Sequence, residues 1–252
     1  MSFITAMQIE LMKIRRSKIL AILAAPCILV IIPGMLSIGG YLKNQPDHAW
    51  EMMFVQSTLM YAYYLMPLSA IIICTLMMQS EYGSRAIIKT LTLPVSRKKV
   101  GMAKLVTVIL LTAAEQIMYF ILFLIAGIIT NTAQHLDVVT PLGYLLLWSL
   151  KLFIMSIPMV MIFWMINVLI VKPLLTVSVS LFFVLPGIFL SNTPVWWIYP
   201  FNYSGYLVSC ELGRLSGGPA VFKMFPFLIL AILFTALGIF ISVQKFGRKS
   251  LE

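Results

Sequence analysis

Long apolar runs alternate with short polar stretches along the chain. The hydrocarbon core of a bilayer is about 30 Å thick, so a helix needs roughly 20 mostly apolar residues to cross it. Six runs reach or approach this length: residues 19–41, 54–78, 105–130, 141–171, 174–190 and 224–243. They predict an all-α membrane protein with six transmembrane helices. Because no remaining stretch is long enough for a separate soluble domain, we expect a single transmembrane domain over residues 1–252.

The composition excludes a water-soluble globular domain. Of the 252 residues 61% are hydrophobic and only 10% are charged, and the mean hydropathy is +1.01. The net charge of +10 comes from basic residues in short stretches between the apolar runs, which indicates the inner membrane surface rather than nucleic acid as their partner. The three cysteines, Cys27, Cys74 and Cys210, are an odd number and imply no disulfide framework.

The distribution of basic residues predicts the orientation. Most of the 18 lysines and arginines lie before the first run, between the second and third, between the fourth and fifth, or after the sixth. Basic residues near transmembrane helices favour the cytoplasmic side. We therefore predict that both termini are cytoplasmic, which an even number of spans requires.

The residues before the first run have the pattern of an amphipathic helix. Ile4, Met7, Leu11 and Ile14 recur at helical spacing on one face. Such a helix, over about residues 3–18, would lie on the inner leaflet, where apolar burial and anionic lipid both stabilise it. The alternative is a basic flank that only sets the topology.

The cytoplasmic loop over residues 80–104 contains a predicted short helix. Gly83 and Ser84 form a turn and a helix cap, residues 85–92 can be helical, and Pro94 ends the helix. With Ile88 and Leu91 on one edge, this helix could dock in a groove of another protein. The alternative is a solvated loop whose charges only fix the orientation.

The external stretch over residues 192–222 is unusually aromatic. It carries Trp196, Trp197, Tyr199, Phe201, Tyr203 and Tyr206. Amphipathic rings favour the level of the lipid headgroups, so we expect short helices or a partly re-entrant hairpin in the outer leaflet. The segment could bind an amphiphilic ligand, or it could be only an aromatic belt that anchors the last span.

Two ionisable residues interrupt the apolar runs. Glu115 lies in the third and Lys151 in the fourth, at depths that differ by only several Å at about 1.5 Å per residue. Adjacent antiparallel helices could bring them together as an intramembrane ion pair. Alternatively, Lys151 extends to the outer surface while Glu115 is protonated or faces a water-filled vestibule.

Sequence motifs for catalysis are missing. The chain has no phosphate-binding loop of the GxxxxGK[ST] type, no HExxH, and no cluster of His, Asp or Glu within an apolar run. We therefore expect that the chain is not an enzyme and binds no cofactor.

The loop and its neighbours resemble a known family. The pattern E-x-G-S-x6-L-x-L-P-V-S-R, which starts at Glu81, and the basic string QIELMKIRRSK are similar to the coupling loop and elbow helix of exporter-type ABC permeases. Within that class, the strings YAYYLMPLS, KPLL and TPVWWIYPFNYSGYLVSC resemble the lantibiotic-immunity permeases of Gram-positive bacteria.

The resemblance implies a complex. A cytoplasmic ATPase dimer would bind ATP and magnesium, and a second, different permease subunit would complete the membrane half. Residues of this chain implied in ATPase coupling are Glu81, Gly83, Arg85, Ile88, Leu91, Pro94 and Arg97. The substrate would be a cationic antimicrobial peptide at the bacterial cell membrane, and residues implied in contact with it or with lipid are Trp196, Trp197, Tyr199, Tyr203 and Tyr206.

Two other functions use the same physical features. An ion-coupled secondary transporter could use Glu115 and Lys151 as a relay, although no clear repeat relates the two halves of the chain. A non-transporting membrane sensor or anchor would only bind a partner. Co-purification of a stoichiometric ATPase would favour the ABC permease over both.

Overall fold

The structure is a computed structural model of the chain. It describes residues 3–15, 19–44, 49–82, 97–133, 139–217, 222 and 224–248. Over these residues the chain forms helices and turns and contains no strand, which confirms the all-α prediction.

The helices follow one another with short connections. Their bounds are α1 Phe3–Arg15, α2 Ile19–Asn44, α3 Ala49–Met60, η2 Tyr61–Leu65, α4 Met66–Tyr82, α6 Arg97–Ala133, α7 Leu142–Leu169, α8 Pro173–Val184, α9 Gly187–Ser191, η3 Trp196–Ile198, η4 Pro200–Asn202, α10 Tyr203–Leu215 and α11 Met224–Arg248.

Five helical segments are long and apolar enough to cross a membrane. They are Trp50–Gln79, Lys98–Ala133, Leu142–Leu169, Pro173–Ser191 and Met224–Phe246. The first predicted span is also helical, as α2, but its described apolar part is the shorter Ala21–Met35. Five of the six predicted spans thus have the required length. That the first span, over residues 19–41, also crosses the membrane stays a prediction.

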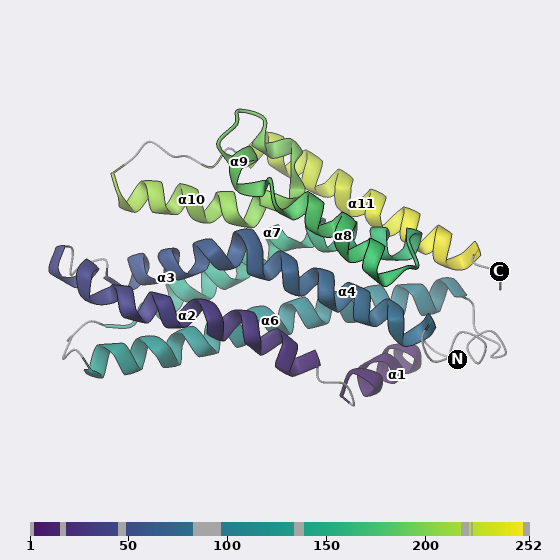
Figure 1. The fold of residues 1–252 in the computed structure, drawn as a ribbon, viewed down its shortest axis with the longest axis horizontal. Coiled ribbons are helices and arrows are strands. Elements are labelled where there is room, and N and C mark those ends of the chain that lie inside the picture. The colour runs from purple at the N-terminus through teal and green to yellow at the C-terminus, as the bar shows by residue number, and fades with distance from the viewer. Residues whose placement is uncertain are drawn as a thin grey trace.

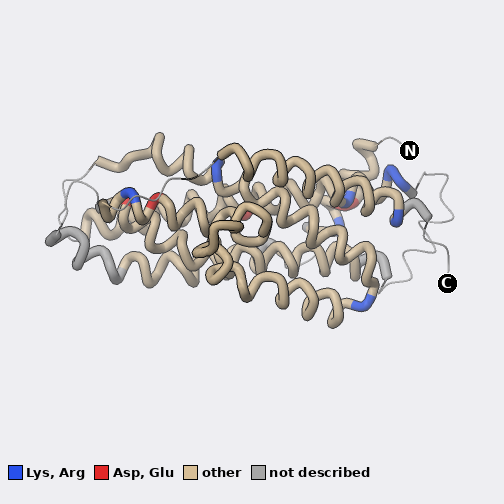
Figure 2. Tube along the Cα trace, turned by 90° about the horizontal axis from the view of Figure 1, so that it is seen from above, with Lys and Arg blue, Asp and Glu red and all other residues tan. Residues whose placement is uncertain are grey.

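The long helices run side by side along one axis of the molecule (Figure 1). Helix α1 and the C-terminal end of α11 lie at the same end of this bundle, and α10 lies toward the opposite end. Figure 2 shows that the described lysines and arginines gather mainly at the end where the termini lie. This asymmetry is what the predicted orientation requires, because basic residues favour the cytoplasmic side.

The second span contains a π-helical turn. Helix α3, η2 and α4 form one continuous helix, and η2 is a π-helix of five residues. A π-turn changes the direction in which the following side chains point, and such turns are frequent at functional sites. Here it brings the buried Tyr61 and Tyr63 to two different neighbours, which are described below.

The predicted fifth span is a broken helix. Helix α8 ends at Val184 and α9 starts at Gly187 after a turn that contains Pro186. Proline has no N–H to donate to a carbonyl of the preceding turn, and its ring disfavours a continuous helix. The third span belongs to a longer helix, because α6 starts at Arg97, before the apolar run over residues 105–130.

Candidate functional site

Most of the predicted coupling residues lie in a segment that the structure does not describe. Gly83, Arg85, Ile88, Leu91 and Pro94 lie among residues 83–96, which the structure does not describe. Of the remaining two, Glu81 lies in the last turn of α4 and Arg97 begins α6. The short helix over 85–92 therefore stays a prediction, and α4 and α6 are the helices to which it connects.

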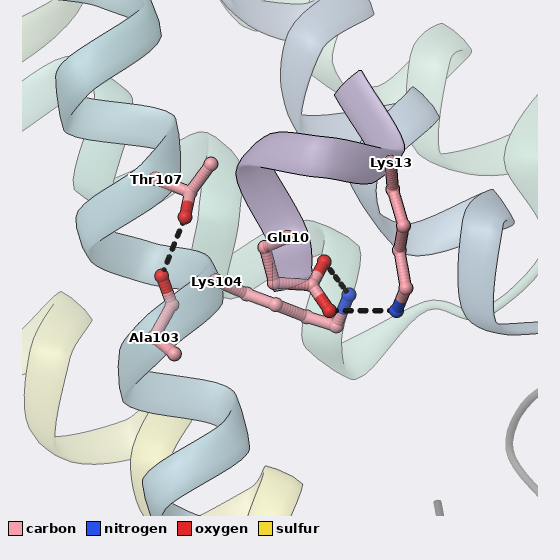
Figure 3. Close-up of polar contacts among 5 residues, drawn as sticks. All are labelled: Glu10, Lys13, Ala103, Lys104 and Thr107. Atoms are coloured by element: carbon pink, nitrogen blue, oxygen red, sulfur yellow. Dashed lines mark hydrogen bonds and ion pairs between the residues drawn. The ribbon is translucent and has the colours of Figure 1, made fainter. Parts of the chain in front are cut away.

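A buried ion pair joins α1 to the start of α6. Figure 3 shows the Glu10 carboxylate between two lysines: Oε2 lies 2.6 Å from Lys104 Nζ, and Oε1 lies 2.7 Å from Lys13 Nζ. The side chains of Lys104 and Glu10 are 0% and 5% exposed. Removing one partner of a buried pair typically costs about 3–5 kcal/mol, because the other charge stays buried. Lys104 is the fully buried partner of Glu10, whereas the Lys13 side chain is 38% exposed.

The pair between Glu10 and Lys104 shows that the buried face of α1 differs from the predicted apolar face. The helix exists, but the face packed on α6 contains Ala6, Glu10 and Ile14 rather than the whole predicted apolar stripe. Ile4 and Leu11 are exposed, which leaves them free to face lipid. Sequence reasoning missed Glu10; the clue was a single acidic residue in an apolar and basic helix.

Glu115 lies in a buried polar network at the middle of α6. Its Oε1 lies 2.6 Å from the Ser69 hydroxyl oxygen of α4 and accepts a hydrogen bond from the Tyr61 hydroxyl of η2 at 3.2 Å. Gln116 Nε2 donates to the Tyr61 hydroxyl at 3.0 Å, and the Tyr61 ring stacks on Tyr119 with 4.3 Å between centroids. The network fastens the second span to the third.

The predicted pair between Glu115 and Lys151 does not form. Lys151 Nζ lies 4.8 Å from the centroid of the Trp148 ring, and Glu115 has the partners just described. The depth estimate ignored the direction in which each side chain leaves its helix. Lys151 shares a face of α7 with Trp148 and Tyr144, whereas Glu115 faces η2 and α4.

A second charged group lies near the N-terminal end of α7. Arg214 Nη2 lies 2.5 Å from Glu211 Oε1 on α10, and the Tyr144 hydroxyl of α7 donates to the same oxygen at 3.0 Å. Burial alone would raise the pKa of Glu211, but hydrogen bonds from Arg214 and Tyr144 and the nearby charge of Lys151 hold it below its usual value. Glu211 is therefore a carboxylate at neutral pH and links α10 to α7.

The aromatic segment packs mainly against the protein. Trp196 is 4% and Tyr203 is 0% exposed. Trp196 stacks on Tyr206 with 4.0 Å between ring centroids, and Tyr203 packs edge-on against Phe227 of α11 at 4.7 Å. This aromatic cluster attaches η3 and α10 to the start of α11.

The burial corrects part of the predicted contact set. Trp196 and Tyr203 are enclosed by other rings, so they present no free surface to a ligand. Trp197, Tyr199 and Tyr206 are partly exposed and remain candidates. Burial raises the pKa of Tyr199 and that of Tyr206 to about 12 each, so both phenols stay neutral. Short helices do form here, as predicted, whereas a position in the outer leaflet stays a prediction.

A cavity of about 300 Å³ opens beside η2. Its walls come from α2 around Pro33, from α3, from η2 and from Ile188 of α9, and its polar residues include Gln56 and Tyr64. Leu29 and Met60 line it and are exposed, so it opens toward a surface that lipid would cover. An apolar cavity with a few polar groups suits an amphiphilic ligand.

The described residues contain no group of three or more His, Cys, Asp or Glu that could hold a metal ion. The ionisable groups instead form the junction at Glu10, the network at Glu115 and the link at Glu211. All three connect one helix to another.

Comparison with known proteins identifies the family. The sequence profile described as ABC-2 family transporter protein matches residues 6–187, from α1 to the start of α9. The aromatic segment, α10 and α11 lie beyond the matched residues. No curated protein matches the chain. Because the profile covers well over half of the sequence, the chain belongs to the ABC-2 family of transporters.

Proposed function

We propose that this chain is the permease subunit of an ATP-binding-cassette transporter that removes lantibiotic-type antimicrobial peptides from the bacterial cell membrane and confers immunity. The family match over residues 6–187 carries this proposal, because ABC-2 proteins are membrane subunits that typically leave catalysis to an ATPase. ATP and Mg²⁺ would bind to a cytoplasmic ATPase dimer. A second, different permease subunit would complete the membrane half.

The contacts at the basic end of the bundle support the coupling part. An ATPase that binds residues 83–96 would act directly on α4 and α6, the two helices on either side of these residues. The Glu10–Lys104 pair connects α6 to α1, so movement of α6 reaches the N-terminal helix as well. The Ser69–Glu115 contact connects α4 to α6 near the middle of the bundle.

The peptide part rests on other features. The aromatic strings resemble lantibiotic-immunity permeases, and Trp197 and Tyr199 are partly exposed near the outer end of α8. The cavity beside η2 combines apolar walls with Gln56 and Tyr64. An amphiphilic peptide offers both apolar side chains and polar backbone groups to such a surface.

The coupling proposal predicts a loss of peptide-stimulated ATPase activity in L91D. A carboxylate on the apolar edge of the predicted coupling helix would be buried without a partner in the ATPase groove. The chain is co-expressed with its candidate ATPase and permease neighbours, and ATPase activity is measured with and without lantibiotic. L91M, which conserves the side-chain volume, is the matched control and keeps the stimulation. Equal stimulation in L91D and L91M, or activity of this chain without an ATPase, would contradict the proposal.

The peptide proposal predicts that W197A/Y199A lowers lantibiotic resistance several-fold in a sensitive host. Both rings are partly exposed and can offer aromatic area to a ligand, and Tyr199 also packs on Phe201 with 5.2 Å between ring centroids. The control is I198A, which removes a neighbouring side chain that is exposed but not aromatic. Membrane abundance is measured for each variant. Unchanged resistance at equal abundance would argue against a peptide contact here and leave the ATPase result intact.

A further inference from the structure

The carboxyl of Glu115 is the most deeply enclosed acid of the described chain outside the ion pairs. It lies 18 residues from each end of α6, and the residue is 0% exposed. Its Oε2 atom has no hydrogen-bond partner. Within the described chain no lysine or arginine contacts it.

The enclosure makes an ionised form expensive. The titratable groups that interact with this carboxyl are Cys27 of α2 and Tyr61 of η2, and neither of them supplies a positive charge. The facing part of α4 contributes Ser69, and the part of α7 nearest Gln116 contributes Leu146, Ser149, Leu150 and Phe153. A buried carboxylate without a cation is strongly disfavoured, whereas the neutral acid leaves only a carbonyl oxygen unpaired.

The count of hydroxyl protons also favours the neutral acid. Ser69 Oγ has one proton but lies within hydrogen-bond distance of two acceptors, the Met66 carbonyl oxygen at 2.8 Å and Glu115 Oε1 at 2.6 Å. If Ser69 donates to Met66, the short contact with Glu115 needs a proton from the carboxyl. The Tyr61 hydroxyl accepts from Gln116 and can still donate its own proton to Glu115. Each contact then has one proton.

We infer that Glu115 is a proton-binding site at the centre of the bundle, whose neutral carboxyl donates to Ser69 and so fastens α4 to α6 beside the π-turn η2. Release of the proton to water leaves a carboxylate that cannot donate to Ser69 and must be hydrated. The contact through which Glu115 holds α4 against α6 is therefore lost when the proton leaves. This inference does not depend on the identity of the transported substrate.

The π-turn gives the site a connection to the outer helix. Two residues after Tyr61, the Tyr63 hydroxyl bonds to Ser209 of α10 at 2.9 Å. A Cβ added to Gly205 of α10 would lie 2.4 Å from the Tyr63 ring, so the two surfaces are in close contact. A change in the state of Glu115 thus reaches α10 through a single turn of helix.

Infrared spectroscopy of the full chain in lipid nanodiscs tests the inference, because a protonated carboxyl has a C=O stretching band that a carboxylate lacks. We expect this band at neutral pH in the wild type and its loss in E115Q. E211Q is the control and keeps the band, because Arg214 holds Glu211 as a carboxylate. Identical spectra of the wild type and E115Q in this region would overturn the inference.

A second variant keeps the test decisive if E115Q does not fold. Y61F removes one hydrogen bond to the Glu115 carboxyl and keeps the aromatic ring. The protonated-carboxyl band should then move to higher frequency, and an unmoved band would overturn the inference. Alkaline pH should also lower the unfolding temperature of the wild type more than that of E115Q, which has no proton to lose at this position. Parallel pH profiles of the two proteins would count against the site.

Discussion

The two ends of the bundle each use a glutamate to hold helices together, but in different surroundings. At the basic end, Glu10 and Lys104 are 2.6 Å apart and 5% and 0% exposed. At the opposite end, Glu211 and Arg214 are 2.5 Å apart, but the Arg214 side chain is 60% exposed. Similar distances therefore describe one pair that excludes water and one that water reaches.

The difference determines what each pair contributes. Water screens an exposed pair, which typically contributes about 0–1 kcal/mol. A buried pair need not stabilise the fold relative to apolar residues, but losing one partner is strongly destabilising. We conclude that the contact of α1 with α6 at Glu10 and Lys104 depends on its charges. The contact of α10 with α7 depends mainly on packing and on hydrogen bonds such as that between Tyr144 and Glu211.

The largest expected effect is that of K104M. It leaves Glu10 buried with one lysine fewer, which should lower the free energy of unfolding by about 3–5 kcal/mol. Unfolding of the purified chain in detergent measures this. K98M is the control, because Lys98 is an exposed lysine of the same helix. The double variant E10L/K104M should recover part of the loss; if K104M and K98M behave alike, the buried Glu10–Lys104 pair contributes no more than an exposed lysine.

The second expected effect tests the packing of α10 against η2. In G205A the new Cβ lies 2.4–2.5 Å from Tyr63 ring atoms, so the ring or α10 must move. Overpacking of this kind costs about 1–3 kcal/mol. G143A is the matched control, because a Cβ there meets nothing within 4 Å and alanine favours a helix. A G205A variant as stable as G143A would show that α10 is not closely packed on η2.

A smaller effect is expected for Y144F. The change removes the hydrogen bond from α7 to Glu211 and keeps the ring, so it should cost about 0.5–1.5 kcal/mol. Comparison of Y144F with R214M in the same unfolding assay ranks the two contacts of Glu211. A larger loss for R214M would mean that the exposed charge pair within α10 contributes more stability than the hydrogen bond from Tyr144.

The smallest effect should appear on acidification. Arg214 helps to hold the pKa of Glu211 below its usual value, so the pair contributes stability above the ordinary glutamate pKa and loses it as the pH falls through the lowered one. R214M should remove about 1 kcal/mol or less at neutral pH and flatten this acid dependence. Unfolding midpoints measured from neutral to acidic pH check this, and an unchanged slope in R214M would refute it.

The spans were predictable because their information is local. A long apolar run predicts a membrane helix whatever its neighbours are, and a charge inside such a run stands out, as Glu115 did. The break at Pro186 was also readable in principle, since proline disfavours a continuous helix. It was missed because hydropathy averages over it.

The partners of the charges were not predictable in the same way. Glu10 and Lys104 are 94 positions apart, and the pairing depends on how α1 turns against α6. The Glu115–Lys151 prediction used depth alone, but Lys151 lies over Trp148 of its own helix, on the face of α7 that carries Tyr144. The π-turn changes the direction in which the side chains of the second span point, and the hydrophobic pattern of the sequence does not predict it. The contact of Tyr61 with Glu115 could therefore not be deduced.

The first turns of α6 lie between the first and last helices of the chain. Lys104 holds α1 on one side, and a Cβ added to Gly101 would lie 2.9 Å from the Phe246 ring of α11. These turns start at Arg97, directly after the loop over residues 83–96. A rotation of these turns would also move α1 and α11, because both helices contact them. Force that enters through this loop would therefore be shared at once by both ends of the polypeptide.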